Sequence, residues 1–324
     1  MSVIKRVSLL ILITWNLFAG PAFSQCCSTG SPVGASVYIG VLEKNTLRFI
    51  AFYRRNYSDA YYEGDSKVTE NNQLKSSNYN FAGITLGYGI TKRLTLETDF
   101  GYFFNKTQVF NNIDFKEEGY GLSNAGVTLK YGALILPAKH IELTFGAGFR
   151  YPFTKTPQEK DGVQLSRDVQ PTTNGFGVCG LLFFNKGFPA ISMRLFTLNR
   201  FDRNFEDPLH YKYGDVLLNS VFVSKLIVKN FFAILQVRSE YRWKDADHSE
   251  TLENTGNWVL FACPQLTYAI MGKWNVSVLV DIPFYKNYNG KQLTPNHSAA
   301  ISLSHDFSFR KTSKATKDIK EIQK

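Results

Sequence analysis

The stretch Leu94-Thr95-Leu96-Glu97-Thr98-Asp99-Phe100-Gly101-Tyr102-Phe103-Phe104 alternates apolar even positions with odd positions that include two carboxylates. A period of two residues predicts a β-strand with one apolar and one polar face, because successive side chains of a strand point to opposite sides. The same alternation recurs at 141–151, 231–243 and 299–309. The sequence therefore predicts an all-β protein built from long amphipathic strands.

Applied to the whole chain, the pattern predicts twelve strands, with turns and loops of two kinds between them. The strands lie near 47–57, 78–90, 94–105, 121–134, 140–151, 173–185, 190–200, 214–227, 231–243, 257–270, 274–285 and 296–309. Short turns fall at 90–93, 137–139, 186–189, 228–230 and 271–273. Longer polar loops fall near 58–77, 106–120, 152–172, 201–213, 244–256 and 286–295.

Short turns on one side, long loops on the other and an even number of strands are typical of an outer-membrane barrel. In lipid every backbone amide has to be paired, so a spanning sheet has to close on itself. We therefore expect a transmembrane antiparallel β-barrel over 47–309, with short periplasmic turns and long extracellular loops. A soluble β-sandwich is the alternative, but its connections would not be sorted by length.

The composition agrees with a barrel and excludes other classes. The chain has 324 residues, 44% hydrophobic and 15% aromatic, with a mean hydropathy of −0.18. So much apolar surface excludes a disordered chain. After the first twenty residues no apolar run approaches the ~18–20 residues that a membrane-spanning helix needs. In a barrel, each strand alternates a lipid-facing apolar row with a polar row, and the hydropathies of the two rows cancel. This explains why a chain rich in aromatic residues has a slightly hydrophilic mean hydropathy.

The N-terminal sequence predicts export. Two basic residues precede an apolar stretch at 7–18 and a small-x-small cleavage site that ends at Ser24. This arrangement is that of a signal peptide, which we assign to 1–24. We expect 25–46 to be a periplasmic segment and 310–324 to be a basic periplasmic tail.

The four cysteines do not predict a disulfide framework. Cys26 and Cys27 are neighbours, and Cys179 and Cys263 lie in apolar alternating segments where a free cysteine behaves as a small hydrophobe. The adjacent pair is the one candidate for a soft metal such as copper(I), or for acylation as a lipoprotein. No histidine cluster lies beside it, so we expect no metal and no other cofactor.

The net charge of +10 carries little information about partners. Two basic residues leave with the signal peptide, and the tail 310–324 has six basic and two acidic residues, hence +4. The remaining 25–309 therefore also carries +4. Binding of nucleic acid is not expected for an exported protein.

Aromatic residues are placed as a membrane barrel requires. Trp243, Trp258 and Trp274 all fall at predicted strand ends, where amphipathic rings favour the membrane interface. Phe309 closes the last strand and resembles the C-terminal signal read by the barrel-assembly machinery. Outer-membrane lipids and this machinery are the expected partners of a barrel that we expect to be monomeric.

If the apolar row faces lipid, the polar row lines the lumen. The predicted lumen-lining residues are Glu97, Asp99, Glu142, Arg150, Arg194, Arg238, Glu240, Arg242, Asp281 and Asp306, with Arg48, Arg54, Lys130 and Arg200 on the same faces. Charges of both signs on these faces favour a narrow barrel filled by salt-bridged side chains. A wet passage is the alternative, in which a cluster of Arg150, Arg194, Arg238 and Arg242 would favour anions. Glycines near 83–180 would leave room along the first half of the wall.

An enzyme is the competing class, because some barrels of this size hydrolyse lipids. Such an enzyme needs a serine beside a histidine on one strand face. None of the five histidines has a serine two residues away, and the pairs His248-Ser249 and His297-Ser298 would point to opposite faces. We predict no catalytic residues.

The Gln25-Cys26-Cys27 start, the stretch Pro32-Val33-Gly34 and the hairpin turn from Tyr88 to Leu94 resemble Bacteroidota members of the meta-pathway phenol-degradation family of outer-membrane transporters. This resemblance implies passage of small, including aromatic, molecules. The sequence thus predicts an outer-membrane barrel that passes or binds small anionic or aromatic solutes. The alternative is a structural or assembly component that acts through its loops or tail.

Overall fold

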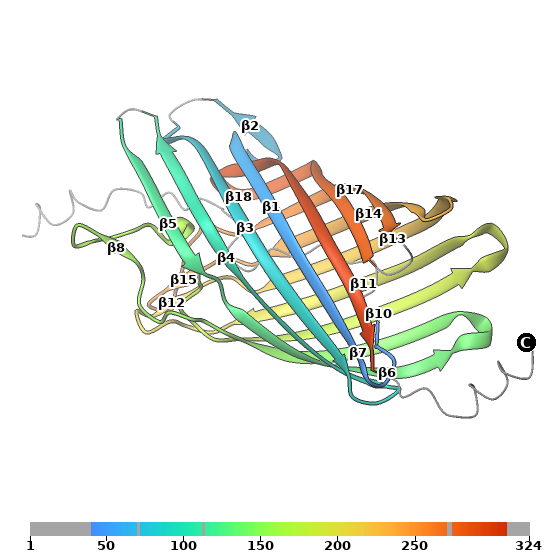
Figure 1. Ribbon diagram of the computed structural model, residues 1–324. Coiled ribbons are helices and arrows are strands. Elements are labelled where there is room, and N and C mark those ends of the chain that lie inside the picture. The colour runs from blue at the N-terminus through green and yellow to red at the C-terminus, as the bar shows by residue number, and fades with distance from the viewer. Residues whose placement is uncertain (1–39, 70–71, 112–113, 271–273, 310–324) are drawn as a thin grey trace, which may run out of the picture.

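The computed structural model describes residues 40–69, 72–111, 114–270 and 274–309. The predicted signal peptide, the basic tail and most of the predicted periplasmic segment lie outside these residues. One antiparallel sheet closes on itself, because the first strand pairs with the last. Figure 1 shows this seam, with the blue first strand beside the red last one. The predicted all-β antiparallel barrel is confirmed.

Eleven strands form the wall of the barrel. They are β1 (Thr46–Gly64), β3 (Leu74–Gly89), β4 (Leu94–Phe110), β6 (Ala125–Leu136), β7 (Ile141–Tyr151), β10 (Gly177–Phe188), β11 (Met193–Asn204), β13 (Val216–Val228), β14 (Phe231–Arg242), β17 (Asn257–Ile270) and β18 (Trp274–Ser308). β18 turns back near Gly290, whose φ is +66°, so that its first half pairs with β17 and its second half with β1. Counting β18 twice gives the twelve passes that the sequence predicts.

Several connections differ from their prediction, two of them at short reversals of the chain. The expected loop at 286–295 is part of β18, because the hairpin keeps its ladder of hydrogen bonds up to the turn at Gly290. The expected turn at 186–189 lies three residues later, at η3 (Pro189–Ile191). Pro189 has no N–H for the ladder and a fixed φ that suits the first position of a 3-10 turn. The strand therefore continues through Phe188.

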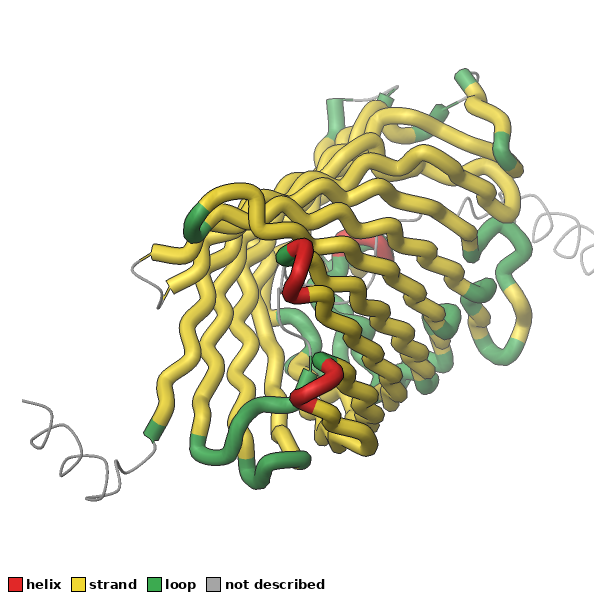
Figure 2. Tube along the Cα trace, turned by 90° about the vertical axis from the view of Figure 1, so that its right-hand side faces the viewer, coloured by secondary structure: helices red, strands yellow, loops and turns green. Residues whose placement is uncertain are grey.

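The short turns lie at one end of the barrel, which faces the viewer in Figure 2. η1 (Pro137–Lys139) and η3 are followed by His140 and Ser192, whose φ values of +53° and +52° let the chain reverse. Phe309 donates its N–H to the Asn45 carbonyl oxygen at 2.9 Å, so both ends of the described chain also lie there. The predicted sorting of short turns and long loops is thus confirmed.

The long-loop end carries additional short elements. β5 (Lys116–Leu122) pairs with the half of β4 nearer the long loops, from Tyr102 to Val109. β6 pairs with the other half, from Leu94 to Asp99. The other elements of this end are β2 (Ser66–Val68), β8 (Glu159–Lys160), β9 (Val163–Gln164), η2 (Arg167–Val169), β12 (Tyr211–Lys212), β15 (Ala246–Asp247) and β16 (Glu250–Thr251). Hydrogen-bonded hairpins therefore replace much of the loop predicted from composition.

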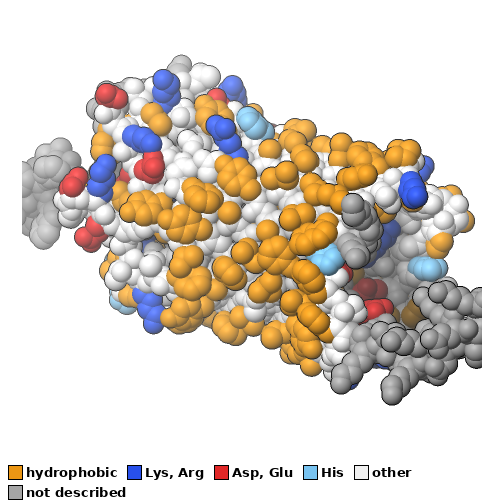
Figure 3. Space-filling view, in the orientation of Figure 1, with side chains coloured by type: hydrophobic (Ala, Val, Ile, Leu, Met, Phe, Trp, Pro, Cys, Tyr) orange, Lys and Arg blue, Asp and Glu red, His pale blue; other side chains and the backbone are white. Residues whose placement is uncertain are grey.

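The outer face of the wall is apolar. Along β14, Leu235 and Val237 are 52% and 45% exposed, whereas the alternate residues Gln236 and Arg238 are buried. Figure 3 shows an apolar belt across this exterior, with charged side chains gathered toward the two ends. No helix among the described residues is long and apolar enough to cross a membrane.

Aromatic pairs border the belt at both ends. At the long-loop end, the Trp258 and Tyr285 rings lie 5.2 Å apart in an edge contact. At the short-turn end, Trp274 stacks on His305 at 4.6 Å. Such rings gain contacts in both lipid and water, as the sequence analysis predicts for an interface.

The position of a residue within the apolar belt predicts how much a charge introduced there lowers the stability of the barrel. We expect Val237→Arg, at the middle of β14, to lower the free energy of unfolding in lipid vesicles by about 2–4 kcal/mol. Ile227→Arg, near the short-turn end of β13, is the control and should cost about 0–1 kcal/mol. Urea titrations followed by tryptophan fluorescence measure both values. Equal losses would contradict the assigned depth.

Candidate functional site: the barrel interior

The interior of the barrel is lined by the charged rows that the sequence places there. The ten residues predicted to line the lumen all lie on the face of their strand opposite the exposed apolar row. Most of their side chains are buried or half-buried. Their role in solute passage stays a prediction.

One network lies at the seam of the barrel. Asp281 of β18 contacts Arg54 of β1 at 3.1 Å and Arg238 of β14 at 3.3 Å, both measured from its Oδ2. The Ser298 hydroxyl donates a hydrogen bond to the same oxygen at 2.7 Å. All four side chains are buried. One carboxylate thus connects the first and last strands to a strand further round the wall.

A second network lies on β7 and β11. Arg200 Nη2 is 2.9 Å from Asp202 Oδ1, and Arg150 Nε is 3.7 Å from the same oxygen. Arg150 also donates to the Asn204 side-chain oxygen at 2.5 Å. These contacts hold two guanidinium groups over one carboxylate, as at the seam.

A third set of contacts lies at the short-turn end. Lys130 Nζ lies 2.6 Å from Glu97 Oε2. The Val41 N–H donates to Glu142 Oε1 at 2.8 Å, and the Leu42 N–H donates to the Thr95 hydroxyl at 2.8 Å. The residues just before β1 therefore bind to inward side chains, and the start of the wall is fixed from inside.

The remaining predicted residues lie nearer the barrel ends. Arg242 Nη2 lies 2.7 Å from Asp245 Oδ1, in a buried pair at the long-loop end. Arg48 binds Asp306 at 2.7 Å in a more exposed pair at the other end. Glu240 is half-buried on the inward face of β14.

The predicted cationic cluster is not formed as a single group. Arg238, Arg242 and Arg150 each have a different carboxylate partner, and Arg194 donates to the amide oxygen of Asn185. An isolated charge in a low-dielectric interior is costly, so each of these guanidinium groups lies beside an acceptor. Asp281 and Asp202 are each shared by two arginines, and the attraction of anions by these arginines stays a prediction.

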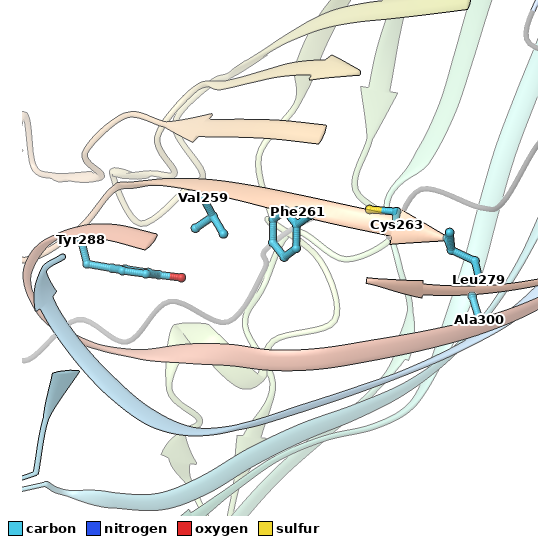
Figure 4. Close-up of a cluster of buried hydrophobic side chains, with 6 residues drawn as sticks. All are labelled: Val259, Phe261, Cys263, Leu279, Tyr288 and Ala300. Carbon is cyan, nitrogen blue, oxygen red and sulfur yellow. The ribbon is translucent and has the colours of Figure 1, made fainter. Parts of the chain in front are cut away.

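Aromatic side chains fill the interior between these networks. Seven inward phenylalanines are less than 10% exposed: Phe52, Phe81, Phe103, Phe183, Phe196, Phe222 and Phe261. Phe196 and Phe222 stack with ring centroids 4.4 Å apart. Figure 4 shows Val259 and Phe261 of β17 projecting into the space enclosed by the strands. The interior is therefore less charged than the sequence pattern indicates.

The inward glycines do not simply widen the lumen as predicted. A Cβ atom at Gly126 would lie 2.4 Å from the Asp99 carboxylate, and one at Gly146 would lie 2.7 Å from Leu181. Each glycine instead admits the side chain of a neighbouring strand against the wall. Small residues thus let larger inward groups lie flat.

The long loop at 152–176 folds against inward side chains at the long-loop end. Val169 and Gln170 are 1% and 2% exposed. Lys106 of β4 donates to the Gln170 carbonyl oxygen at 2.8 Å, and the Ser166 N–H donates to Glu117 of β5 at 2.7 Å. The sequence predicts this loop but not its inward course.

A second loop holds the first in place. Arg167 forms an ion pair with Asp207, and its guanidinium carbon lies 4.5 Å from the Tyr211 ring centroid. The Tyr213 hydroxyl donates to the Arg167 carbonyl oxygen at 3.1 Å. Arg167 therefore makes several of the contacts between the two loops, which are also joined by the hydrogen bond from the Phe205 N–H to the Phe176 carbonyl oxygen at 2.9 Å.

Asp168 lies at the buried face of the same loop. Burial raises the pKa of Asp168 from 3.8 to about 7. Lys106 and Arg242 lower this pKa by a smaller amount, as does the hydrogen bond from Gln108 at 3.4 Å. The loop therefore carries a carboxyl group that titrates near neutral pH.

The interior presents guanidinium groups, carboxylates and aromatic rings. Among the described residues, no group of three or more His, Cys, Asp or Glu is placed to hold a metal ion. Cys179 and Cys263 are buried and free. The candidates Cys26 and Cys27 lie outside the described residues.

The seam network predicts a large stability effect. We expect Asp281→Asn to lower the free energy of unfolding by about 3–5 kcal/mol, because it leaves two buried arginines without their carboxylate. Asp306→Asn, in the exposed pair, is the control and should cost about 0–1 kcal/mol. Urea unfolding in lipid vesicles measures both. Similar losses from the two variants would show that the buried seam contact contributes no more stability than an exposed ion pair does.

The raised pKa of Asp168 predicts that the stability of loop insertion depends on pH. Its raised pKa means that the folded loop favours the protonated acid, so the stability of insertion falls as the pH rises from about 4 to about 7. Amides of 163–170 should therefore be better protected from hydrogen exchange at pH 5.5 than at pH 8, after correction for intrinsic rates. Asp168→Asn should remove the difference; an unchanged difference would refute the assignment.

Comparison with known proteins identifies the fold. No family model and no curated protein matches the chain, so the resemblance to the phenol-degradation family is not confirmed. The COG4313 outer membrane channel from Pseudomonas putida F1 aligns with a TM-score of 0.67 and 11% identity over 85% of this chain and 100% of that chain.

Two further structures align at lower scores. The NanC porin has a TM-score of 0.44 and 9% identity, covering 78% of this chain and 98% of its own. The CymD monoaromatic hydrocarbon channel has a TM-score of 0.41 and 8% identity, covering 82% and 90%. At such identities the likeness shows the fold alone. That fold is an outer-membrane β-barrel, and it places this protein in the outer membrane.

Proposed function

We propose that this protein is a non-catalytic outer-membrane channel that passes small solutes containing an aromatic ring, including anionic ones. The observation that carries the proposal is the pairing of cations with aromatic rings along the interior. Arg238 lies 4.5 Å from the Phe261 ring centroid, and Arg194 lies 5.0 Å from that of Phe196.

Such a pair offers two kinds of contact at one place. The ring provides apolar surface, and the guanidinium group provides a positive charge and planar donors. A third pair, Lys106 over Phe103 at 5.1 Å, lies beneath the inserted loop. Solutes with an aromatic ring and a carboxylate match both contacts, whereas neutral sugars match neither.

The interior arginines are only partly offset by carboxylates, which supports a small solute that carries a negative charge. Asp281 and Asp202 each lie beside two arginines, so each of these groups keeps one net positive charge. Local contacts then decide which solutes pass. A monomeric channel in outer-membrane lipid, assembled by the barrel machinery, is part of the same proposal.

Liposome swelling tests the proposal. Vesicles containing the folded barrel should admit benzoate and benzyl alcohol faster than protein-free vesicles. Arg194→Gln should slow benzoate about fivefold, equivalent to about 1 kcal/mol, and leave benzyl alcohol unchanged. Arg194 suits this test because it lies over the Phe196 ring and donates to the neutral side-chain oxygen of Asn185.

Lys229→Gln provides the matched control, because Lys229 is exposed in a short turn between β13 and β14. It should change neither flux. Absence of any flux above protein-free vesicles would refute the channel and favour a structural component. Equal slowing of both solutes by Arg194→Gln would refute the role of its charge.

A further inference from the structure

The lipid-facing side of the wall is hollowed at one place. A groove of about 630 Å³ crosses β18, β1, β3, β4 and the end of β5. Its floor is formed by Ala51, Ala82 and the bare backbone of Gly83 and Gly101. A cavity of this size lies within the range of small-molecule binding sites.

The strand register explains why the groove exists. Ala51 pairs with Leu303 on one side and with Ile84 on the other, and Ala82 lies between Tyr53 and Tyr102. Small side chains in the centre of two cross-strand rows are thus flanked by large ones. The lining is almost entirely apolar, so a hydrocarbon chain fits it and a hydrated solute does not.

Rings inside the barrel lie directly behind the floor of the groove. A Cβ atom at Gly83 would lie 2.5 Å from the Phe52 ring, and one at Gly101 would lie 2.2 Å from the Phe81 ring. These rings pack against the glycines from the inner side. The hollow is therefore backed by buried aromatic side chains and is not an opening into the lumen.

A polar rim borders the groove on its extracellular side. The Tyr53 hydroxyl donates to the Asn80 side-chain oxygen at 2.6 Å, and the Asn80 amide donates to the Asn105 side-chain oxygen at 2.6 Å. A row of amides on a lipid-facing wall marks the level where hydrocarbon gives way to head groups, because buried polar groups are costly in lipid.

Arg55 stands at this rim with its charge available. It is exposed, directly opposite Asn80 in the register, and two residues from Tyr53 on the same face of β1. No carboxylate among the described residues lies within salt-bridge distance of it. A guanidinium group is well suited to a phosphate oxygen pair.

From these features we infer that the groove binds one outer-leaflet lipid with a phosphate in its head group. An acyl chain lies over Ala51 and Ala82, and the phosphate contacts Arg55. The groove supplies the shape for the chain, and Arg55 with the amide rim supplies the complementary charge and polarity at the correct level. This site is outside the lumen and does not depend on solute passage.

Native mass spectrometry of the purified barrel tests the site, with phosphatidylglycerol as the probe and diacylglycerol of the same chains as the phosphate-free comparison. The wild type should retain one phosphatidylglycerol in preference to diacylglycerol. Arg55→Gln should weaken this binding about fivefold, the effect of losing one cation near an anionic surface. Ala82→Phe, which fills the groove, should abolish it.

Val221→Phe is the matched control, because Val221 is 48% exposed on the lipid face of β13 and does not line the groove. It should bind as the wild type does. Equal retention of both lipids, or wild-type binding by Arg55→Gln, would refute the site even if Ala82→Phe fails to fold. Loss of benzyl alcohol flux in folded Ala82→Phe would instead assign the groove to solute.

Discussion

Every backbone amide that crosses lipid has to be hydrogen-bonded within the protein, and the rest of this structure depends on that constraint. It is satisfied only when β1 pairs with the second half of β18 from Thr46 to Gly64. Among the described residues, no disulfide crosses the seam. Asp281, with an arginine on each side, adds buried side-chain contacts at the place where the sheet would otherwise have two free edges.

Closure fixes which face of each strand is inside, and the period of two then makes much of the fold predictable. The twelve passes, the short turns and the inward charged rows follow from alternation alone, because one face has to suit lipid. The turn at Pro189 and the hairpin at Gly290 were misplaced for a local reason. Strands here extend beyond the bilayer, where composition no longer distinguishes a paired strand from a loop.

The interior was predicted less well, because pairing between distant strands is not visible in one sequence. Alternation places Phe103 in the same row as Glu97 and Asp99, and Phe196 in the same row as Arg194, which indicates that the lumen is partly aromatic. The partners of each arginine depend on register around the whole barrel. The inward course of 152–176 depends on contacts such as Arg167 with Asp207, which no spacing rule indicates.

The same glycines and alanines that appear as breaks in the apolar pattern have opposite effects on the two faces of the wall. On the inside, Gly83 and Gly101 are covered by phenylalanine rings, so the lumen gains aromatic surface. On the outside, with Ala51 and Ala82, they form a hollow in the belt. A small residue in the barrel wall therefore affects both the lumen and the lipid-facing surface, and its role has to be assigned on each face separately.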